Sequence, residues 1–433
     1  MKKGNFQVIV LIIFVAAAIL GVLVFSGVIP IGGNSNPGAQ GTVVLWGTEK
    51  ASILGPLIDD FNRANPTLIL KYVEKPINTF DNDLLEALAS GTGPDMFFIT
   101  DSLAFKYSNK IFTIPYASLP VNTFKNSFIG AGEVFLTEKG IVALPIAVDP
   151  LMMYYNRSML DANGIAYPPA DWNEFSNLVP LLTKKDDKGA IIKSAVAMGQ
   201  FSNVFYAKDI LSTLFMQAGS PIVTEKNGFF TSSLNQTNGK YDLSSVLKFF
   251  TDFADPLKNV YSWNKSFSSS RDAFSAENLA FYFGFASELQ SLVNKNPNQN
   301  FLVTSMPQIK DSNLKLTFAH VIGIAISSFS KNFNTAFTTA GLLANGDFAS
   351  KFSTSLGIAP ARRDLIKTMP TDAYSPAFYT SAFYARSWLD PSPKESDDIF
   401  RGMVEKVLSG SLSQTEAMSD GNAKMGLLLI PTQ

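Results

Sequence analysis

The segment LPIAVDPLMMYYNRSML, Leu144 to Leu160, decides how the chain is divided. LPIAV has the composition of a strand that leaves one sheet, and LMMYYN has the composition of a strand that enters another. Asp149 and Pro150 stand between them, and both residue types are disfavoured in central strands but tolerated where a strand breaks or crosses over. We therefore expect two strands interrupted at Asp149, with the chain passing there from one structural unit into a second.

Such a crossover would place Asp149 at the floor of a cleft. Its carboxylate would accept hydrogen bonds from hydroxyl or ammonium groups of a ligand, and alternate side chains from Met152 to Tyr155 would face the same cleft. The alternative is structural. Asp149 would then cap backbone donors at the crossover, and the methionine and tyrosine side chains would belong to the core.

Composition limits the classes of protein to which the chain can belong. With 433 residues, 46% of them hydrophobic, it is long enough for two core-forming units. The formal net charge of -1 provides no overall field for nucleic acid. The absence of cysteine excludes disulfides, thiolate catalysis and thiolate metal sites, and the single histidine, His320, leaves little room for imidazole chemistry. We expect neither a metal nor a cofactor.

The N-terminal run VIVLIIFVAAAILGVLVF, Val8 to Phe25, carries no charge and follows Lys2 and Lys3. As a helix it would span roughly 27 Å, close to the hydrocarbon thickness of a bilayer. We predict a retained membrane anchor over residues 1–28, with a cleaved signal peptide as the alternative, because the run is long and no clear small-x-small site follows it. Cytoplasmic lysines would leave the remainder outside. Residues 29–41, rich in Gly, Asn and Pro, are predicted to be a flexible linker.

Strand and helix patterns alternate after the linker. Strands are predicted at Thr42–Thr48, Thr67–Glu74 and Met96–Thr100, with helices around residues 53–61 and 81–91 between them. The short connections argue for a parallel sheet covered by helices, and ligands bind beyond the carboxyl ends of such strands. The same positions would suit ordinary polar loops. The candidate ligand-binding residues there are Trp46, Thr48, Glu49, Thr100 and Asp101.

A chain of short motifs follows the opening segment as far as Phe175. They are Tyr155-Asn156 at a strand end, Gly164-Ile165, Pro168-Pro169 and the helix start Trp172-Asn173-Glu174. This order resembles the most characteristic segment of extracellular solute-binding proteins of the maltose-binding type, which serve ATP-driven importers. Asp171 stands where the family usually has threonine, and aspartate caps a helix equally well. Weaker matches extend along nearly the whole extracellular part, at TVVLWGT (Thr42–Thr48), GTGPDMFFIT (Gly91–Thr100), FSAENLAFYFGFAS (Phe274–Ser287), SMPQIK (Ser305–Lys310), VIGIAISSFSKN (Val321–Asn332) and LGIAPARRD (Leu356–Asp364).

The resemblance implies an α/β, two-lobed periplasmic-binding-protein fold with hinge strands, in which lobe closure encloses a solute. Lobe 1 would comprise residues 42–146 plus about 300–350, and lobe 2 residues 147–299 plus about 351–433. SMPQIK and VIGIAISSFSKN would be strands that return into lobe 1. The protein would be a monomer on the outer side of the cell membrane and would deliver its solute to the permease subunits of an ABC importer.

Further binding candidates come mainly from the resemblance. Phe285 falls where relatives place an aromatic residue after a glycine, and Trp388 lies in a segment similar to a late cleft-lining helix. Arg386 would favour an anionic group, and Gln200 lies in the loop GQFSN. Trp172 is expected to pack in the core, whereas Trp263 is expected at the cleft rim or in a surface loop.

Aromatic candidates bear on the class of ligand. Sugar faces stack on Trp and Tyr rings while carboxylates and amides bind the hydroxyls, so we expect a mono- or oligosaccharide. Peptides, polyamines and other small solutes remain alternatives, as does a surface sensor without a transporter. Glu49, Asp101 and Asp149 could share one cleft as in a glycoside hydrolase. Carboxylates suit sugar binding equally well, however, and no catalytic motif occurs, so we expect a protein that is not an enzyme.

Overall fold

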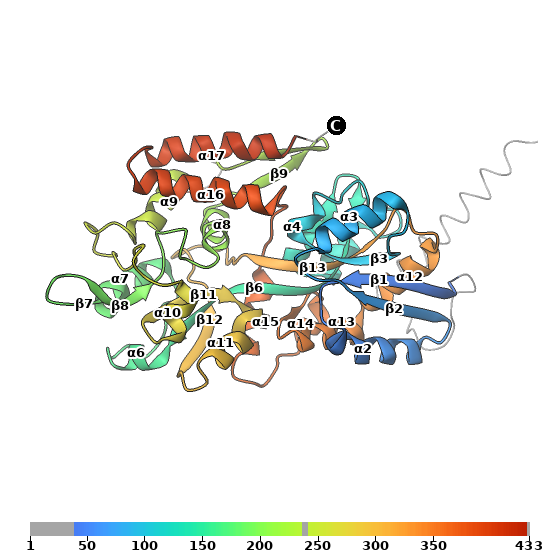
Figure 1. The fold of residues 1–433 in the computed structure, drawn as a ribbon, viewed down its shortest axis with the longest axis horizontal. Helices are drawn as coiled ribbons and strands as arrows, with labels where there is room; N and C mark the ends of the chain where they lie inside the picture. Colours follow the sequence, from blue (N-terminus) through green and yellow to red (C-terminus); the bar gives the residue numbers. More distant parts are fainter. Residues whose placement is uncertain (1–38, 236–240, 431–433) are drawn as a thin grey trace, which may run out of the picture. The chain divides into compact units, whose positions relative to one another are not determined.

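The computed structural model describes residues 39–235 and 241–430, which fall into two compact units (Figure 1). Unit 1 comprises the chain up to Val148, Val321–Ser355 and Pro360–Thr368. Unit 2 comprises Asp149–His320, Leu356–Ala359 and the chain from Met369 onward. The expected anchor at 1–28 and all of the expected linker except residues 39–41 lie outside the described residues. In the part of the chain that is described, no helix combines the length and apolar character needed to cross a membrane.

The first half of unit 1 has the predicted β-α-β-α-β order. It runs through β1 (Gly41–Gly47), α2 (Ala51–Ala64), β2 (Leu68–Glu74), α3 (Phe80–Ser90) and β3 (Met96–Thr100). β1 pairs in parallel with both β2 and β3, which confirms the predicted parallel sheet. Helix α3 ends at Gly91, whose φ of 70° is a left-handed conformation that glycine adopts without a steric penalty.

The unit 1 sheet gains an antiparallel strand from a later part of the chain. The strand order within this unit is β2-β1-β3-β13-β6, and β13 (Ala319–Ile326) runs antiparallel to β3. In Figure 1, α2 and α3 lie on opposite sides of the unit 1 strands. The other elements that lie in unit 1 are α4 (Asp101–Ala104), α5 (Val121–Ser127), η1 (Gly130–Phe135), β4 (Leu136–Thr137), β5 (Gly140–Ile141), α12 (Phe333–Leu343), α13 (Gly346–Ser355) and α14 (Arg363–Ile366).

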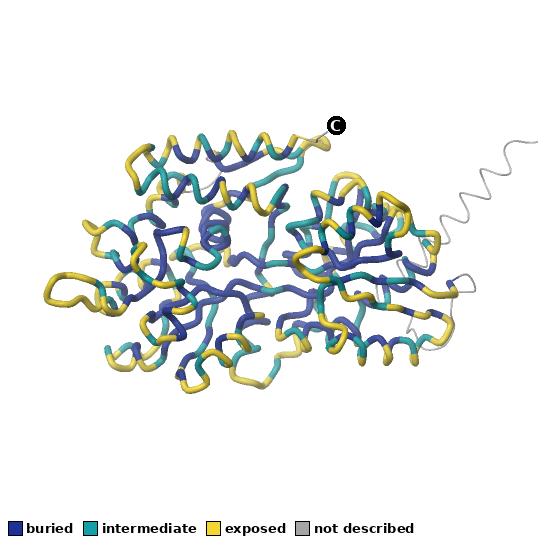
Figure 2. Tube along the Cα trace, viewed as in Figure 1, coloured by how far each residue is buried: buried dark blue, intermediate teal, exposed yellow. Residues whose placement is uncertain are grey.

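The opening segment forms one strand, β6 (Leu144–Asn156), so the predicted interruption at Asp149-Pro150 is wrong. The ladder between β6 and β11 (Leu279–Phe285) begins at the Leu151–Phe285 pair and continues to Tyr155–Phe281. Pro150 therefore precedes this ladder, where a residue without an N–H group is tolerated. The division into units nevertheless falls between Val148 and Asp149, within the strand. Figure 2 shows that β6 and β11 are buried along their length, apart from the half-buried Asp149 in β6.

Unit 2 is built around β6 and β11. Its strand order is β6-β11-β8-β7, and β12 (Phe301–Ser305) pairs antiparallel with the second half of β6. Met152, Met153, Tyr154 and Tyr155 are all buried, which supports the core alternative for these four side chains. The further elements of unit 2 are α6 (Arg157–Asp161), α7 (Trp172–Leu182), β7 (Lys184–Lys185), β8 (Ile191–Val196), α8 (Ala207–Gln217), β9 (Val223–Lys226), β10 (Phe229–Ser232), α9 (Leu243–Asp252), α10 (Ser270–Ser275), η2 (Ala286–Glu288), α11 (Leu289–Lys295), α15 (Ser375–Tyr384), α16 (Pro393–Leu408) and α17 (Gln414–Leu428). The two-residue strand β14 (Ala359–Pro360) pairs with β6 and spans a boundary between the units.

Two tryptophans pack in the interior of unit 2. Trp172 is buried against Phe175 and donates from Nε1 to Gln217 Oε1 at 2.7 Å, so its expected packing role is confirmed. The residue that caps helix α7 is also as predicted, because the Asp171 side chain accepts hydrogen bonds from the backbone nitrogens of Asn173 and Glu174. Trp263 is 0% exposed and stacks on Phe267, so neither expected position, cleft rim or surface loop, is right.

The unit boundaries differ from the expected lobe boundaries at two places. Residues 300–320 group with unit 2 because β12 forms its ladder with residues 152–156 of β6, so SMPQIK does not return to unit 1. Only from Val321, within β13, does the chain rejoin unit 1. Pro360–Thr368 belongs to unit 1, where the backbone of Ala361 bonds to Ile146 and Ile129.

Candidate functional site

The unit 1 candidates gather at the edge where two neighbouring parallel strands end. The β1–β3 register pairs Leu45 with Met96 and Trp46 with Phe97, so the carboxyl ends of both strands share one edge. We call the residues there the unit 1 group: Trp46, Thr48, Glu49, Thr100 and Asp101. Gly47 has no room for a side chain, since a Cβ would lie 2.5 Å from the Phe98 ring.

Trp46 and Glu49 are partly accessible members of the unit 1 group. Lys75 places its ammonium group 3.9 Å from the centre of the Trp46 ring, so a cation already occupies one ring face. The Glu49 carbonyl accepts from the Tyr72 hydroxyl at 2.6 Å, and burial raises the pKa of the Glu49 carboxyl. A half-buried carboxyl of this kind is suited to accept hydrogen bonds from ligand hydroxyls.

Asp101 has a structural role in unit 1. Its side chain is 1% exposed, and Oδ1 accepts the backbone N–H of Val321 at 2.9 Å. This bond ties the end of β3 to β13, so Asp101 is a buried residue at the start of α4 and not the ordinary polar loop residue of the alternative. Thr100 is half-buried, and its hydroxyl is 2.7 Å from that of Ser102.

Asp149 lies on β6 as the first residue of unit 2. Oδ1 accepts the backbone N–H of Ser287 at 3.0 Å, which links β6 to the turn after β11. Burial raises the pKa of the Asp149 carboxyl, against the opposing effects of the Ser287 hydrogen bonds and of His320. Asp149 therefore caps a backbone donor, as the structural alternative expected, and remains half-buried.

Phe285 is held in an aromatic cluster of unit 2 and is only 2% exposed. Its ring centre lies 4.6 Å from His320, 4.7 Å from Tyr206 and 6.1 Å from Phe318. The Tyr206 ring meets Phe285 edge-on, with an interplanar angle of 86°. Tyr206, which is half-buried, is thus the more accessible ring of the pair.

Arg386 is brought close to this cluster, whereas Trp388 is packed away from solvent. Arg386 forms a backbone bridge with Phe318 and donates from Nη1 to the Ala385 carbonyl at 2.9 Å. Trp388 is 4% exposed and stacks on Phe400, with the Lys208 ammonium 5.9 Å from its ring centre. Gln200 is 7% exposed in the loop before α8.

A pocket of about 300 Å³ opens in unit 2 beside the start of α8. Arg401 of α16 lies over the Phe201 ring and donates to Asp397 at 2.8 Å, which places a charged pair against an aromatic wall. Sequence reasoning singled out the loop GQFSN but missed the aromatic pair after it and both charged residues. The pocket is lined by residues 201–209 together with Ser269, Asp397 and Arg401.

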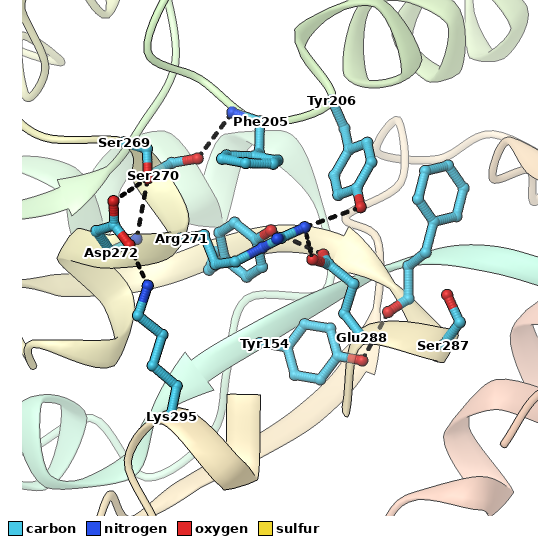
Figure 3. Close-up of polar contacts among 12 residues, drawn as sticks. Tyr154, Phe205, Tyr206, Ser269, Ser270, Arg271, Asp272, Ser287, Glu288 and Lys295 are labelled. Atoms are coloured by element: carbon cyan, nitrogen blue, oxygen red, sulfur yellow. Dashed lines mark hydrogen bonds and ion pairs between the residues drawn. The ribbon is translucent and has the colours of Figure 1, made fainter. Parts of the chain in front are cut away.

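A charged network supports the wall of this pocket (Figure 3). Arg271 of α10 forms an ion pair with Glu288 of η2 and donates from Nη2 to the Tyr206 hydroxyl at 3.1 Å. Glu288 also accepts from the Tyr282 hydroxyl at 2.7 Å, and burial raises the pKa of its carboxyl. No local sequence signal marks this network, because its members lie on three separate segments.

The unit 2 group, which we define as Asp149, Tyr206, Phe285, Asp397 and Arg401, contains two carboxyl groups, one guanidinium and two aromatic rings, of which Phe285 is buried and Tyr206 is partly accessible. Such a set can bind a small polar solute through ring contacts and directed hydrogen bonds. Among residues 39–235 and 241–430, no set of three or more His, Cys, Asp or Glu side chains is arranged to hold a metal ion.

Comparison with known proteins identifies the family. Residues 56–378 match the family model described as bacterial extracellular solute-binding protein. The chain belongs to this family. A binding protein of Brucella abortus strain 2308 is 21% identical to this solute-binding protein over 407 residues, which cover 90% of this chain and 93% of the relative. The family and the solved neighbours are solute-binding proteins and not enzymes.

Solved structures share the fold of this solute-binding protein. A cyclo/maltodextrin-binding protein complexed with maltotetraose has a TM-score of 0.73 at 15% identity, covering 93% of this chain and all (100%) of its own. The sugar-binding protein MalE of Xanthomonas citri has a TM-score of 0.70 at 16% identity, and the match covers 90% of this chain and 97% of MalE. MalE of Listeria monocytogenes in complex with maltose has a TM-score of 0.68 at 16% identity, and the match covers 90% of this chain and 99% of that protein. The expected mixed α/β, two-lobed solute-binding fold is therefore confirmed.

Proposed function

We propose that this protein is an extracellular receptor that captures a carbohydrate and delivers it to an ABC importer. The observation that carries the proposal is the unit 2 pocket, which is lined by Phe205 and Tyr206 together with the Arg401–Asp397 pair. Aromatic rings suit the apolar faces of sugars, and charged side chains suit their hydroxyls. The neighbours solved with maltotetraose and maltose support the same class of ligand.

In this proposal units 1 and 2 are the two lobes, and each of the two groups would contact the solute. Contacts to both groups would favour a closed form, because a ligand shifts a conformational equilibrium by its differential affinity. The permease would recognise that form. The family description supports an extracytoplasmic location. Anchoring by residues 1–28 and a monomeric state remain predictions.

A cationic solute, such as a polyamine or the amino end of a peptide, is the second candidate. Asp149 favours it, because a half-buried carboxyl with a raised pKa gains more from a neighbouring ammonium group than an exposed one does. The same residue would accept hydrogen bonds from sugar hydroxyls. Asp149 alone therefore does not distinguish the two classes of ligand.

The test is a ligand screen on the full-length chain in mild detergent, read by melting temperature and tryptophan fluorescence. The panel contains maltose, maltotetraose, mannotriose, short peptides and spermidine. A ligand at 100 times its dissociation constant adds about 2.7 kcal/mol of stability. We expect saccharides to raise the melting temperature. A response to spermidine or peptides alone would contradict the carbohydrate proposal and favour the second candidate.

Fluorescence adds a check on the location of the site. Three of the four tryptophans are buried, and Trp46 is the partly accessible one. We expect the ligand-induced fluorescence change to disappear in Trp46→Phe and to persist in the control Trp172→Phe, whose indole binds Gln217, a residue that does not line the pocket. Delivery is tested by uptake of the identified solute into cells with and without this protein, since a sensor without a transporter would leave uptake unchanged.

A further inference from the structure

Arg271 makes three different contacts on the wall of the unit 2 pocket. Its guanidinium carbon lies 4.0 Å from the centre of the Phe205 ring, and Nη2 donates to the Tyr206 hydroxyl at 3.1 Å. The same Nη2 forms the ion pair with Glu288. Figure 3 shows the side chain reaching between the aromatic pair and the turn that carries Glu288. One side chain thus contacts two consecutive pocket-lining aromatic residues.

Tyr206 needs support from outside its own loop. It precedes α8 with φ 60° and ψ 29°, a left-handed backbone conformation that residues other than glycine seldom adopt. Such a conformation persists where the surroundings hold it. The Phe285 ring supports one edge of Tyr206, and Arg271 binds the hydroxyl at the far end of the ring. The two contacts together determine the direction of the ring.

Glu288 provides a fixed anchor for Arg271. Its side chain is 6% exposed and also accepts from the Tyr282 hydroxyl on β11. Gly284 makes room for it, because a Cβ there would lie 2.4 Å from Glu288 Oε2. Glu288 belongs to the turn in which Ser287 donates to Asp149. Arg271 therefore connects Tyr206 to the segment that carries Phe285 and holds Asp149.

We propose that Arg271 is a positioning residue for ligand binding, which fixes the Tyr206 ring against Phe285 and thereby sets the shape of the unit 2 pocket. The proposal rests on the proposed function in taking this pocket as the ligand site. Removing Arg271 also leaves the buried Glu288 carboxyl without its cation, which lowers stability. The ordering of Tyr206 is therefore measured separately from stability.

The first test needs no ligand. Near-ultraviolet circular dichroism is recorded for the full-length wild type, Tyr206→Phe, Arg271→Met and the double variant. The difference between the dichroism spectra of the wild type and Tyr206→Phe is the contribution of the Tyr206 ring, which is large when the ring is held in one orientation. We expect this difference to fall at least twofold in the Arg271→Met background, because the ring is no longer held. An unchanged difference would overturn the proposal.

The matched control is Lys295→Met, which removes a cation that pairs with Asp272, the neighbour of Arg271 on α10. The Lys295 and Asp272 side chains are 42% and 51% exposed, so their ion pair lies at the surface, whereas Glu288 is buried. In the Lys295→Met background, we expect the dichroism difference caused by Tyr206→Phe to be the same as in the wild type. A loss of signal equal to that of Arg271→Met would overturn the proposal, since any weakening of α10 would then have the same effect.

The second test uses binding of maltotetraose at a temperature well below melting, where every variant is folded. We expect Arg271→Met to raise the dissociation constant about tenfold, the scale of one charge-assisted hydrogen bond, with a smaller rise for Arg271→Lys. Adding Tyr206→Phe to Arg271→Met should raise the dissociation constant little further. A lower melting temperature with an unchanged dissociation constant would overturn the positioning role. If the wild type binds no saccharide, the proposed function fails, and the dichroism test still decides the role of Arg271.

Discussion

The buried carboxylate of Asp101 accepts the backbone N–H of Val321 at 2.9 Å, and this bond joins the end of β3 to the strand by which the chain rejoins unit 1. A side chain thus satisfies a backbone donor in a place where water has little access. The bond explains why a candidate ligand contact lies inside the protein. It also makes the cost of removing the carboxylate predictable.

Asp101→Ala is expected to lower the free energy of unfolding by about 1–3 kcal/mol, because it leaves a buried N–H without an acceptor. Asp101→Asn keeps an oxygen acceptor and should cost less. Urea unfolding measures both variants. The control Asp59→Ala removes an exposed carboxylate of α2 and should change stability by less than about 0.5 kcal/mol. Equal effects at the two positions would refute the role of the Val321 bond.

Gly284→Ala is expected to destabilise the protein by about 1–3 kcal/mol, as overpacking does in a filled core. A Cβ at Gly284 would lie 2.4 Å from Glu288 Oε2 and 2.5 Å from Tyr282 Cε1. Gly402, inside helix α16, has no atom within 4 Å of the same built position. Gly402→Ala should therefore stabilise the helix by about 0.5–1 kcal/mol. The two melting temperatures should move in opposite directions, and a shared direction would contradict the packing described for Gly284.

Asp149 is expected to make the protein less stable as the pH rises. Burial raises the pKa of this carboxyl above its ordinary value of 3.8, so the folded chain binds the proton more tightly than the unfolded chain. Stability from this group is greatest below pH 3.8 and is lost as the pH rises through the raised pKa. Asp149→Asn should remove that loss and be more stable than the wild type at pH 7.

The measurement is urea unfolding of wild type and Asp149→Asn over a series of pH values. The asparagine oxygen can still accept from Ser287, so the hydrogen bond at 3.0 Å is retained. The gain should shrink towards acidic pH. Asp187→Asn, on an exposed turn, is the control and should show no such trend. A gain for Asp149→Asn that does not vary with pH would count against the assignment.

Lys208→Met is expected to cost about 3–5 kcal/mol, because it leaves the buried Asp390 carboxylate without its cation. Lys208 Nζ lies 2.8 Å from Asp390 Oδ2, and the two side chains are 14% and 5% exposed. The exposed Lys424–Asp420 pair is the matched control, and Lys424→Met should cost about 0–1 kcal/mol. Chemical denaturation compares the two variants. Similar losses would show that burial does not determine the contribution of the Lys208 pair.

Local patterns predicted the elements whose signals lie within a few neighbouring residues. The three strands and two helices between Gly41 and Thr100 match within a few residues, because apolar runs there end at strong turn and cap residues. Asp171 caps its helix through bonds to the next few backbone nitrogens, again a local relation. The interruption of β6 was predicted wrongly, since pairing with β11 from Leu151 onward sustains the strand and is not encoded near Pro150.

The candidate site was predicted in part. Asp149 and Phe285, foreseen separately, are brought together through the turn at Ser287. Trp388 was expected near a ligand and Trp263 at the cleft rim or in a surface loop, yet their rings pack on Phe400 and Phe267. Tyr206 was missed because its backbone conformation and its contact with Phe285 depend on the assembled unit.

The sequence by itself determined the family, the alternating strands and helices of unit 1, and the absence of thiolate chemistry. These properties depend on composition, periodicity and the order of motifs, all of which are local. The tertiary structure decided which residues accompany each unit and which side chains meet at the pocket. Arg271 meets Tyr206 across 65 residues of sequence, and Asp149 meets Ser287 across 138. Strand pairing and the burial of charged partners bring such residues together, and neither can be predicted from the residues next to them in the sequence.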